Sequence, residues 1–304
     1  KSAKDLTVSE AALLVGILPA PSAWDPAKDP GQAEYRWNYV MNAMESEGYI
    51  TSSERALATF PETVEYQNED KYGGPKGYLL TSALKEVEKS TGITQEEIES
   101  RGYTIITTFD RKAQRATEKA VAKMPDDHDP NLQVGAVTLD VKTGAILSMY
   151  GGTDYLERQR NAVTQDIAQA GSTFKPFALI AALEDGISLK TKFSGRNLMT
   201  VPGFEKKVRN FGNDSFGQID LATATAYSVN TVYAQLGQKV GPENVKDVAI
   251  RAGLPEDTAG LKDNAANVLG TASPHVIDMA RAYATIANNG VRTEPYMIAQ
   301  VLDA

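Results

Sequence analysis

The chain has 304 residues, and its 42% hydrophobic content is enough for a sizeable core and excludes a disordered polypeptide. A formal net charge of −8 without a basic run argues against nucleic acid as a partner. There is no cysteine, which excludes disulfides and thiol chemistry. The length allows two domains, or one large domain with appendages.

The first 60 residues are predicted to be helical. Prolines between residues 19 and 30 separate the first helix from the second, and Thr51 or Ser52 can cap the third. The longest apolar stretch, Ala11 to Ala20, is too short to cross a bilayer. Residues 61–77 are acidic and turn-rich, which indicates a linker. The expected helices are Val8 to Leu18, Gly31 to Gly48 and Ser52 to Thr59.

Strands and helices then follow one another. Helices are predicted at 78–90, 94–100 and 111–123, the last capped by Asp110, and strands at 102–109, 134–139 and 145–150. Alanine-rich helices dominate from there on, at 173–184, 221–226, 231–239, 243–252 and 274–288, before a strand at 297–302. Strands, a helical block and a further strand predict an α/β (α+β) fold with a sheet flanked by helices.

The chemistry-bearing segments are Gly171-Ser172-Thr173-Phe174-Lys175-Pro176 and Ser228-Val229-Asn230. A serine and a lysine three apart on a helix share one face. A serine hydroxyl needs a base to take its proton, and a lysine that burial keeps neutral can be that base. Ser228 could relay the proton, and Asn230 could hold a substrate amide. These four residues predict a serine acyl-transferase.

The position of Ser172 has two interpretations. Pro176 is tolerable only in the first turn of a helix, so the helix should begin near Ser172 and place its hydroxyl at the positive end of the dipole. The simpler alternative is an N-cap serine.

Other candidate residues are weaker. Ser82-Ala83-Leu84-Lys85 repeats the serine–lysine spacing inside an amphipathic helix and is interpreted as a solvated face. His128, in a polar loop, and His275, at a helix N-terminus with Pro274 as its first residue, have no ligand spacing, so neither a metal site nor a histidine-based triad is expected. Glu10 is interpreted as a structural position.

A series of segments along almost the whole chain resembles the class A (bifunctional) penicillin-binding proteins, and the segments occur in the order found in that family. The resemblance implies the penicillin-recognising serine transferase fold and three parts: residues 1–60 as the end of a glycosyltransferase domain, 61–130 as a linker region, and 131–304 as an incomplete transpeptidase domain. The residues that carry it are Leu6 to Leu14, Leu18 to Ser22, Tyr103 to Asp110, Gln114 to Ala116, Arg160 to Pro176, Tyr227 to Thr231, Leu269 to Pro274 and Met279 to Gly290.

The resemblance implies D,D-transpeptidation, in which peptidoglycan stem peptides are cross-linked along nascent glycan strands. Ser172 would attack the D-Ala-D-Ala carbonyl, Lys175 would accept its proton, Ser228 and Lys175 would return it, and Asn230 would hold the substrate amide. β-Lactams would acylate Ser172. Two alternatives remain open, a serine β-lactamase or D,D-carboxypeptidase, and a β-lactam sensor or scaffold without turnover. No cofactor and no glycosyltransferase activity are expected.

The family's third motif, Lys-Thr-Gly on a strand after the Ser-x-Asn segment, does not follow Ser228 in this sequence. Lys142-Thr143-Gly144 comes too early, in a turn between two strands, and is interpreted as hairpin chemistry. In the family, the missing strand binds the substrate carboxylate and supplies an oxyanion donor. A second polypeptide or a missing segment is therefore expected to carry it.

The resemblance also places a membrane anchor outside this chain and the parent protein at the extracytoplasmic face of the membrane. Ala168-Gln169-Ala170 departs from the Arg-Gln-Pro of many relatives.

Overall fold

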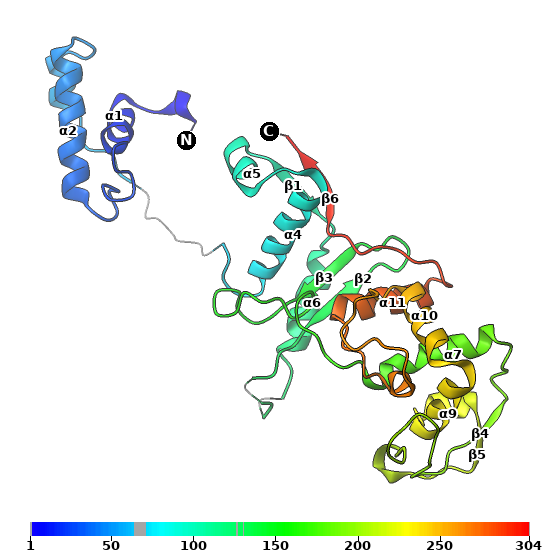
Figure 1. The fold of residues 1–304 in the computed structure, drawn as a ribbon. Coiled ribbons are helices and arrows are strands. Elements are labelled where there is room, and N and C mark those ends of the chain that lie inside the picture. Colours follow the sequence, from blue (N-terminus) through cyan, green and yellow to red (C-terminus); the bar gives the residue numbers. More distant parts are fainter. Residues whose placement is uncertain (1, 64–70, 126, 130, 304) are drawn as a thin grey trace. The chain divides into compact units, whose positions relative to one another are not determined.

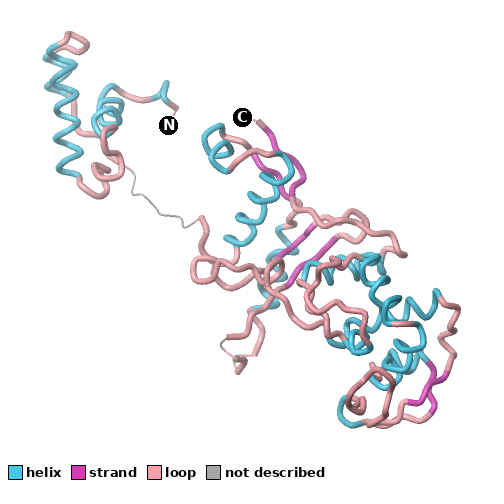
Figure 2. Tube along the Cα trace, viewed as in Figure 1, coloured by secondary structure: helices cyan, strands magenta, loops and turns pink. Residues whose placement is uncertain are grey.

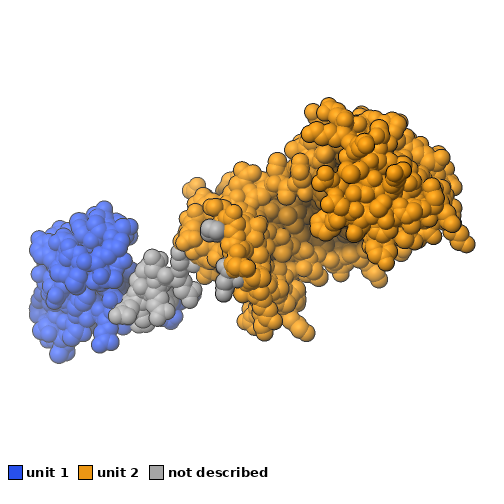
Figure 3. All heavy atoms as spheres, turned by 90° about the horizontal axis from the view of Figure 1, so that it is seen from below, with its two compact units in different colours: residues 1–70 blue, residues 71–304 orange. Residues whose placement is uncertain are grey.

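The computed structural model describes residues 2–63, 71–125, 127–129 and 131–303, and it divides the chain into two compact units, residues 1–70 and 71–304 (Figures 1 and 3). The middle of the predicted linker, residues 64–70, lies outside the described residues. Across the described ranges, no helix is both long and apolar enough to span a membrane.

The smaller unit contains three α-helices, as predicted, and the first two pack against each other. Trp37, 4% exposed, fills its core and donates a hydrogen bond from Nε1 to the carbonyl of Ser9 (3.2 Å). Glu10 accepts the backbone N–H of Thr7 in a capping box, which agrees with a structural position. Thr51 caps the third helix. The elements are η1 (Ala3–Asp5), α1 (Val8–Ile17), α2 (Pro30–Ser46) and α3 (Ser52–Leu57).

The larger unit combines a helical block with short antiparallel strand pairs, which Figure 2 shows in magenta among the helices. Its helices are α4 (Lys76–Thr91), α5 (Gln95–Arg101), α6 (Arg111–Val121), α7 (Lys175–Glu184), α8 (Leu221–Ala226), α9 (Asn230–Val240), α10 (Pro242–Ala252) and α11 (Val276–Ala287), with 3₁₀ turns η2 (Gly171–Phe174), η3 (Phe211–Asn213) and η4 (Ala265–Leu269). Its strands are β1 (Thr104–Thr107), β2 (Ala136–Leu139), β3 (Ile146–Tyr150), β4 (Lys192–Ser194), β5 (Gln218–Asp220) and β6 (Ile298–Leu302).

The β2–β3 pair is flanked by helices, as the pattern predicted. Ala136 pairs with Tyr150, and helices α11 and α6 pack against β2 and β3. Gln114 of α6 is 8% exposed, and its side-chain amide makes two hydrogen bonds with the backbone of Met149 in β3 (2.9 and 3.0 Å). The amide thus pairs with β3 as the backbone of a neighbouring strand would. Asp110 caps α6 by accepting the N–H of Ala113 (2.7 Å).

Much of the region predicted as a linker packs within the larger unit. Strand β1 pairs antiparallel with β6 near the end of the chain, Thr104 opposite Leu302, and α4 contacts both β3 and β6. Glu86 of α4 accepts the N–H groups of Met297 and Ile298 (2.9 and 3.0 Å). The boundaries between the predicted domains stay a prediction.

The helical block surrounds α9. Helix α7 packs against α9 and α10. Phe174, the N-cap residue of α7, and Phe177 within it are completely buried, and their rings lie edge to face with centroids 4.9 Å apart. Tyr233 and Leu236 of α9 are equally buried in the same cluster. This packing fixes the start of α7 against the start of α9.

Two helix starts differ from the prediction. The segment from Gly171 to Phe174 is a 3₁₀ turn, and α7 begins only at Lys175, with Pro176 in its first turn. Helix α11 begins at Val276 with His275 as its N-cap, so Pro274 precedes the cap and is not the first helical residue. In both places the helical sequence pattern begins before the helix does. The residues before α7 form a 3₁₀ turn, and the cap residue before α11 is extended.

Candidate active site

Glycine makes the turn that carries Ser172. Gly171 has φ +54° and donates its N–H to the carbonyl of Gly270 (3.0 Å). A Cβ at Gly270 would collide with the backbone of Gly171, so only glycine fits there. The neighbouring Ala170 donates to the carbonyl of Ala272 (2.9 Å), and these two backbone hydrogen bonds fix the segment that leads to Ser172.

The 3₁₀ turn explains how Ser172 and Lys175 meet. Residues i and i+3 eclipse in a 3₁₀ turn, so the two side chains point the same way. Lys175 Nζ lies 3.0 Å from Ser172 Oγ. Ser172 is exposed and lies inside the 3₁₀ turn; the N-cap residues of that turn and of α7 are Ala170 and Phe174, so Ser172 is not an N-cap serine.

The second segment lies between two helices. Helix α8 ends at Ala226, and Ser228 follows with φ +51°, a left-handed conformation that costs a serine roughly 1–2 kcal/mol. This conformation turns both oxygens of Ser228 toward Lys175, with the carbonyl at 2.6 Å and Oγ at 2.9 Å from Nζ. Asn230 opens α9 and places Oδ1 at 2.7 Å from the same nitrogen. The structure thus brings all four predicted residues together.

The hydrogen-bond partners of Lys175 fit either protonation state of its amine. The Ser228 carbonyl and Asn230 Oδ1 can only accept, so each takes an N–H of Lys175 Nζ. The hydroxyls of Ser172 and Ser228 can accept a third N–H from the charged ammonium, and either one of them can instead donate to the single lone pair of the neutral amine.

Burial favours the neutral amine. Lys175 is 3% exposed, and desolvation lowers its pKa to about 8. None of the four oxygen atoms that it contacts belongs to a carboxylate, and its one ring contact is with Tyr233, 5.6 Å from Nζ. The arrangement can therefore accept a proton from Ser172 and pass it on through Ser228.

Sequence reasoning missed the groups that hold this cluster. Asn210, 3% exposed, accepts the N–H of Thr231 in the first turn of α9 (3.0 Å). Arg209 accepts a hydrogen bond from Asn230 Nδ2 through its carbonyl (2.8 Å). Tyr283 of α11 donates to the carbonyl of Thr173 (2.7 Å). No signal in the sequence singles out these residues, because each acts through a partner far away in the chain.

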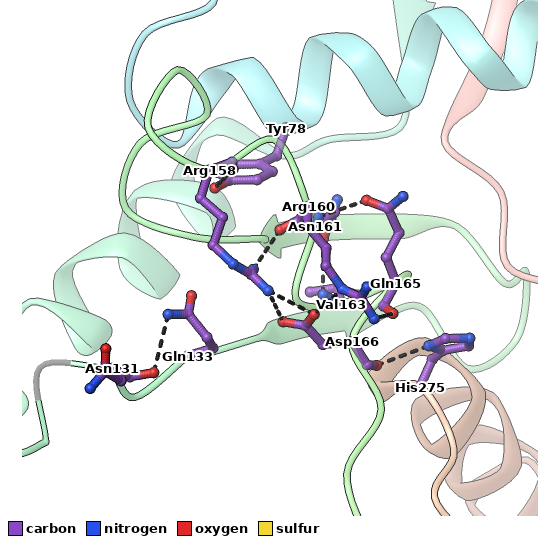
Figure 4. Close-up of polar contacts among 10 residues, drawn as sticks. All are labelled: Tyr78, Asn131, Gln133, Arg158, Arg160, Asn161, Val163, Gln165, Asp166 and His275. Atoms are coloured by element: carbon purple, nitrogen blue, oxygen red, sulfur yellow. Dashed lines mark hydrogen bonds and ion pairs between the residues drawn. The ribbon is translucent and has the colours of Figure 1, made fainter. Parts of the chain in front are cut away.

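The chain before Ser172 is held by an ion-pair cluster, drawn in Figure 4. Arg158 approaches both oxygens of Asp166 (2.8 and 2.9 Å), and Arg160 Nε approaches one of them (2.6 Å). Burial raises the pKa of Asp166, but these two arginines outweigh it and leave that pKa below its ordinary value. The carbonyl of Asp166 accepts a hydrogen bond from His275 Nδ1 (2.9 Å), which ties the segment to the cap of α11.

The other candidates lie apart from this cluster. Ser82 accepts a hydrogen bond from Asn161 (3.3 Å), while Lys85 is exposed. Lys142-Thr143-Gly144 forms the β2–β3 turn, as predicted. His128 is exposed, and among the described residues no group of histidine and carboxylate side chains could hold a metal ion.

Two family models match the chain. The model described as penicillin binding protein transpeptidase domain matches residues 134–303, and the model described as transglycosylase matches residues 1–45. The chain belongs to the penicillin-binding protein family. A transglycosylase segment followed by a transpeptidase domain is the order of the class A members, so the resemblance inferred from the sequence is confirmed.

Individual relatives agree. Penicillin-binding protein 1A of Mycobacterium tuberculosis is 38% identical over all of this chain and 38% of its own length, and penicillin-binding protein 2D of Bacillus subtilis is 30% identical over all of this chain and 44% of its own length. The chain thus spans about two fifths of these relatives. The structure of PonA1 from Mycobacterium tuberculosis in complex with penicillin V superposes with a TM-score of 0.69 at 35% identity, covering 76% of this chain and 63% of that one.

The fold is also shared with a more distant structure. Penicillin-binding protein 1A from Haemophilus influenzae has a TM-score of 0.79 at 22% identity and covers 100% of this chain and 59% of that chain. The predicted penicillin-recognising serine transferase fold is confirmed.

Proposed function

We propose that Ser172, Lys175, Ser228 and Asn230 form the acylation centre of a peptidoglycan D,D-transpeptidase. The observation that carries this proposal is the position of Lys175 Nζ, almost completely buried and within 3.0 Å of oxygen atoms from the other three residues. A buried lysine whose pKa is lowered to about 8 can supply a neutral amine as the base for the exposed serine nucleophile beside it.

The proposed reaction has two half-steps. Ser172 Oγ attacks the carbonyl of a D-Ala-D-Ala stem peptide while its proton passes to Lys175, and the departing D-Ala takes that proton through Ser228. The amine of a neighbouring stem peptide then attacks the acyl-serine ester and releases Ser172 as a free hydroxyl. Asn230 holds the donor amide.

The proposal requires a second oxyanion-hole donor, which none of these four residues supplies. No Lys-Thr-Gly follows Ser228 in the 304 residues, so a further segment or a second polypeptide would supply that strand. The N–H of Ser172 would be one oxyanion donor, and the added strand would be the second. We also propose that the parent protein is anchored outside these residues and works at the extracytoplasmic face of the membrane, on stem peptides of nascent glycan strands.

The first experiment is an intact-mass spectrum with and without penicillin V, followed by peptide mapping. The relative with known structure that binds penicillin V makes this β-lactam the natural probe. We expect a one-to-one adduct on the Ser172 peptide, and none in Ser172→Ala. An adduct on another peptide, or none in the full polypeptide that carries these residues, would contradict the proposal.

The alternatives give different time courses. A β-lactamase would lose the adduct rapidly, because water hydrolyses the acyl-enzyme. A D,D-carboxypeptidase would release D-Ala from a D-Ala-D-Ala peptide and pass the acyl group to water instead of to an amine acceptor. A sensor or scaffold would keep the adduct and show no turnover of D-Ala-D-Ala peptides with an amine acceptor. The transglycosylase match at residues 1–45 favours the transpeptidase over a stand-alone hydrolase.

A further inference from the structure

One extended segment beside the acylation centre presents alternate residues to solvent. Along Lys207 to Phe211, Val208 and Asn210 are buried (5% and 3% exposed), whereas Lys207, Arg209 and Phe211 are exposed, Phe211 by 92%. Such an alternation is typical of an extended chain, in which every second side chain lies on the same face. Lys207 and Arg209 therefore share one outward face, and Phe211 follows them as the first residue of η3.

The inward residues fix this segment firmly. Asn210 uses its whole side chain: Nδ2 donates to the carbonyls of Gly195 and Asp214 (2.9 and 3.0 Å), and Oδ1 accepts the N–H of Thr231 (3.0 Å). Val208 exchanges two backbone hydrogen bonds with Met199 (2.8 and 3.0 Å). The outward face is thus presented by a rigid support, which lowers the entropic cost of binding a ligand.

A short chain of contacts links this segment to the nucleophile. The carbonyl of Arg209 accepts a hydrogen bond from Asn230 Nδ2 (2.8 Å), Asn230 Oδ1 lies 2.7 Å from Lys175 Nζ, and Lys175 Nζ lies 3.0 Å from Ser172 Oγ. One N–H of Asn230 Nδ2 is occupied by Arg209, and the second is available for a substrate carbonyl. A peptide held by Asn230 would lie next to Arg209.

The charge of the segment is unusual for this protein. Lys206, Lys207 and Arg209 are exposed, in a chain whose net charge is −8. Within the described ranges, the side chain of Arg209 forms no ion pair or hydrogen bond. A planar guanidinium is suited to bidentate binding of a carboxylate.

We propose that Arg209 is a specificity-determining residue that binds a carboxylate on the acyl-donor peptide. This carboxylate lies on the acyl side of the scissile bond, where Asn230 holds the donor amide, and is distinct from the terminal carboxylate of the departing D-Ala. The inference rests on the proposed function and adds to it a preference for donors that are anionic at this position.

Benzylpenicillin and carbenicillin test the proposal, because they differ by one carboxylate on the acyl side chain. The measured quantity is the second-order rate constant for acylation of Ser172 in the full polypeptide. We expect Arg209→Gln to lower the ratio of the carbenicillin rate constant to the benzylpenicillin rate constant about three- to tenfold. This is the effect expected from losing one partly exposed, charge-assisted hydrogen bond to the extra carboxylate of carbenicillin. Arg209→Lys should retain part of the ratio.

A matched control separates contact from net charge. Lys239→Gln removes the same charge from the exposed last turn of α9, about 14 Å along the helix from Asn230. It should leave the ratio unchanged. An unchanged ratio in Arg209→Gln, or an equal fall in Lys239→Gln, would overturn the inference while Ser172 is still acylated. No adduct on Ser172 with either β-lactam would overturn the proposed function as well.

Discussion

Two segments of this chain have the same serine–lysine spacing and entirely different surroundings. In α4, Lys85 is exposed and Ser82 contacts Asn161. At the start of α7, Lys175 is buried against three other polar residues and lies 3.0 Å from Ser172. The motif specifies only that two side chains are close along the chain. The chemistry comes from burial and from groups on other elements.

The largest difference between the segments is expected in acylation. Lys175→Ala should lower the rate of β-lactam acylation at Ser172 about 10³-fold, because general base catalysis contributes about 10²–10⁴-fold. Lys85→Ala is the matched control and should leave the rate unchanged. Stopped-flow acylation with a fluorescent penicillin gives both rates. Equal effects of the two substitutions would contradict the assignment of the base.

The pH dependence sharpens the same comparison. The pKa of Lys175 is lowered to about 8, and only the neutral amine accepts a proton. The acylation rate should therefore rise about tenfold from pH 6 to pH 7, continue to rise through pH 8, and level off above it. The Ser172 adduct rate measured from pH 6 to 9.5 checks this. A rate independent of pH would show that the lysine is not the base.

Ser228 tests how the backbone contributes. Its φ of +51° strains any residue with a Cβ, so Ser228→Gly should have a free energy of unfolding about 1 kcal/mol higher than Ser228→Ala. Both variants lack the hydroxyl, so acylation should be slow in each. Urea unfolding monitored by circular dichroism compares them. If the alanine variant is as stable as the glycine variant, the left-handed conformation is not the source of strain.

The smallest effect is expected at Lys142-Thr143-Gly144. Lys142→Gln should change neither the acylation rate nor, beyond about 0.5 kcal/mol, the free energy of unfolding, since the side chain is an exposed turn residue. Asp140→Ala should lower the urea midpoint of unfolding more than Lys142→Gln does, because Asp140 Oδ1 accepts the N–H groups of Lys142 and Thr143 (2.9 and 3.0 Å). A large loss of acylation in Lys142→Gln would show that this Lys-Thr-Gly takes part in the reaction.

The elements with strong local signals could be predicted from the sequence. Helices with a clear cap, such as α6 after Asp110, were placed within two residues of their observed ends. The family and the four candidate residues also followed from local motifs. The starts of α7 and α11 were each placed two residues too early, because the helical pattern continues through residues that tertiary contacts hold in other conformations.

The supporting residues could not be predicted. Asn210 accepts the N–H of Thr231 with its side chain, and the Arg209 carbonyl accepts from the side chain of Asn230; such contacts depend on how a loop folds back onto α9. An asparagine among polar residues has the same local pattern whether its side chain faces solvent or is buried with every hydrogen bond satisfied. The lowered pKa of Lys175 likewise depends on burial by separate helices.

The close approach of Gly171 and Gly270 makes the turn that carries Ser172 depend on a contact between residues far apart in the chain. The N–H of Gly171 donates to the carbonyl of Gly270 (3.0 Å), and a Cβ at Gly270 would collide with the backbone of Gly171. Contacts between residues of large sequence separation form slowly, because the entropy of closing the loop between them must be overcome first. We therefore expect this turn to reach its final conformation only when the segment that contains Gly270 has docked against it.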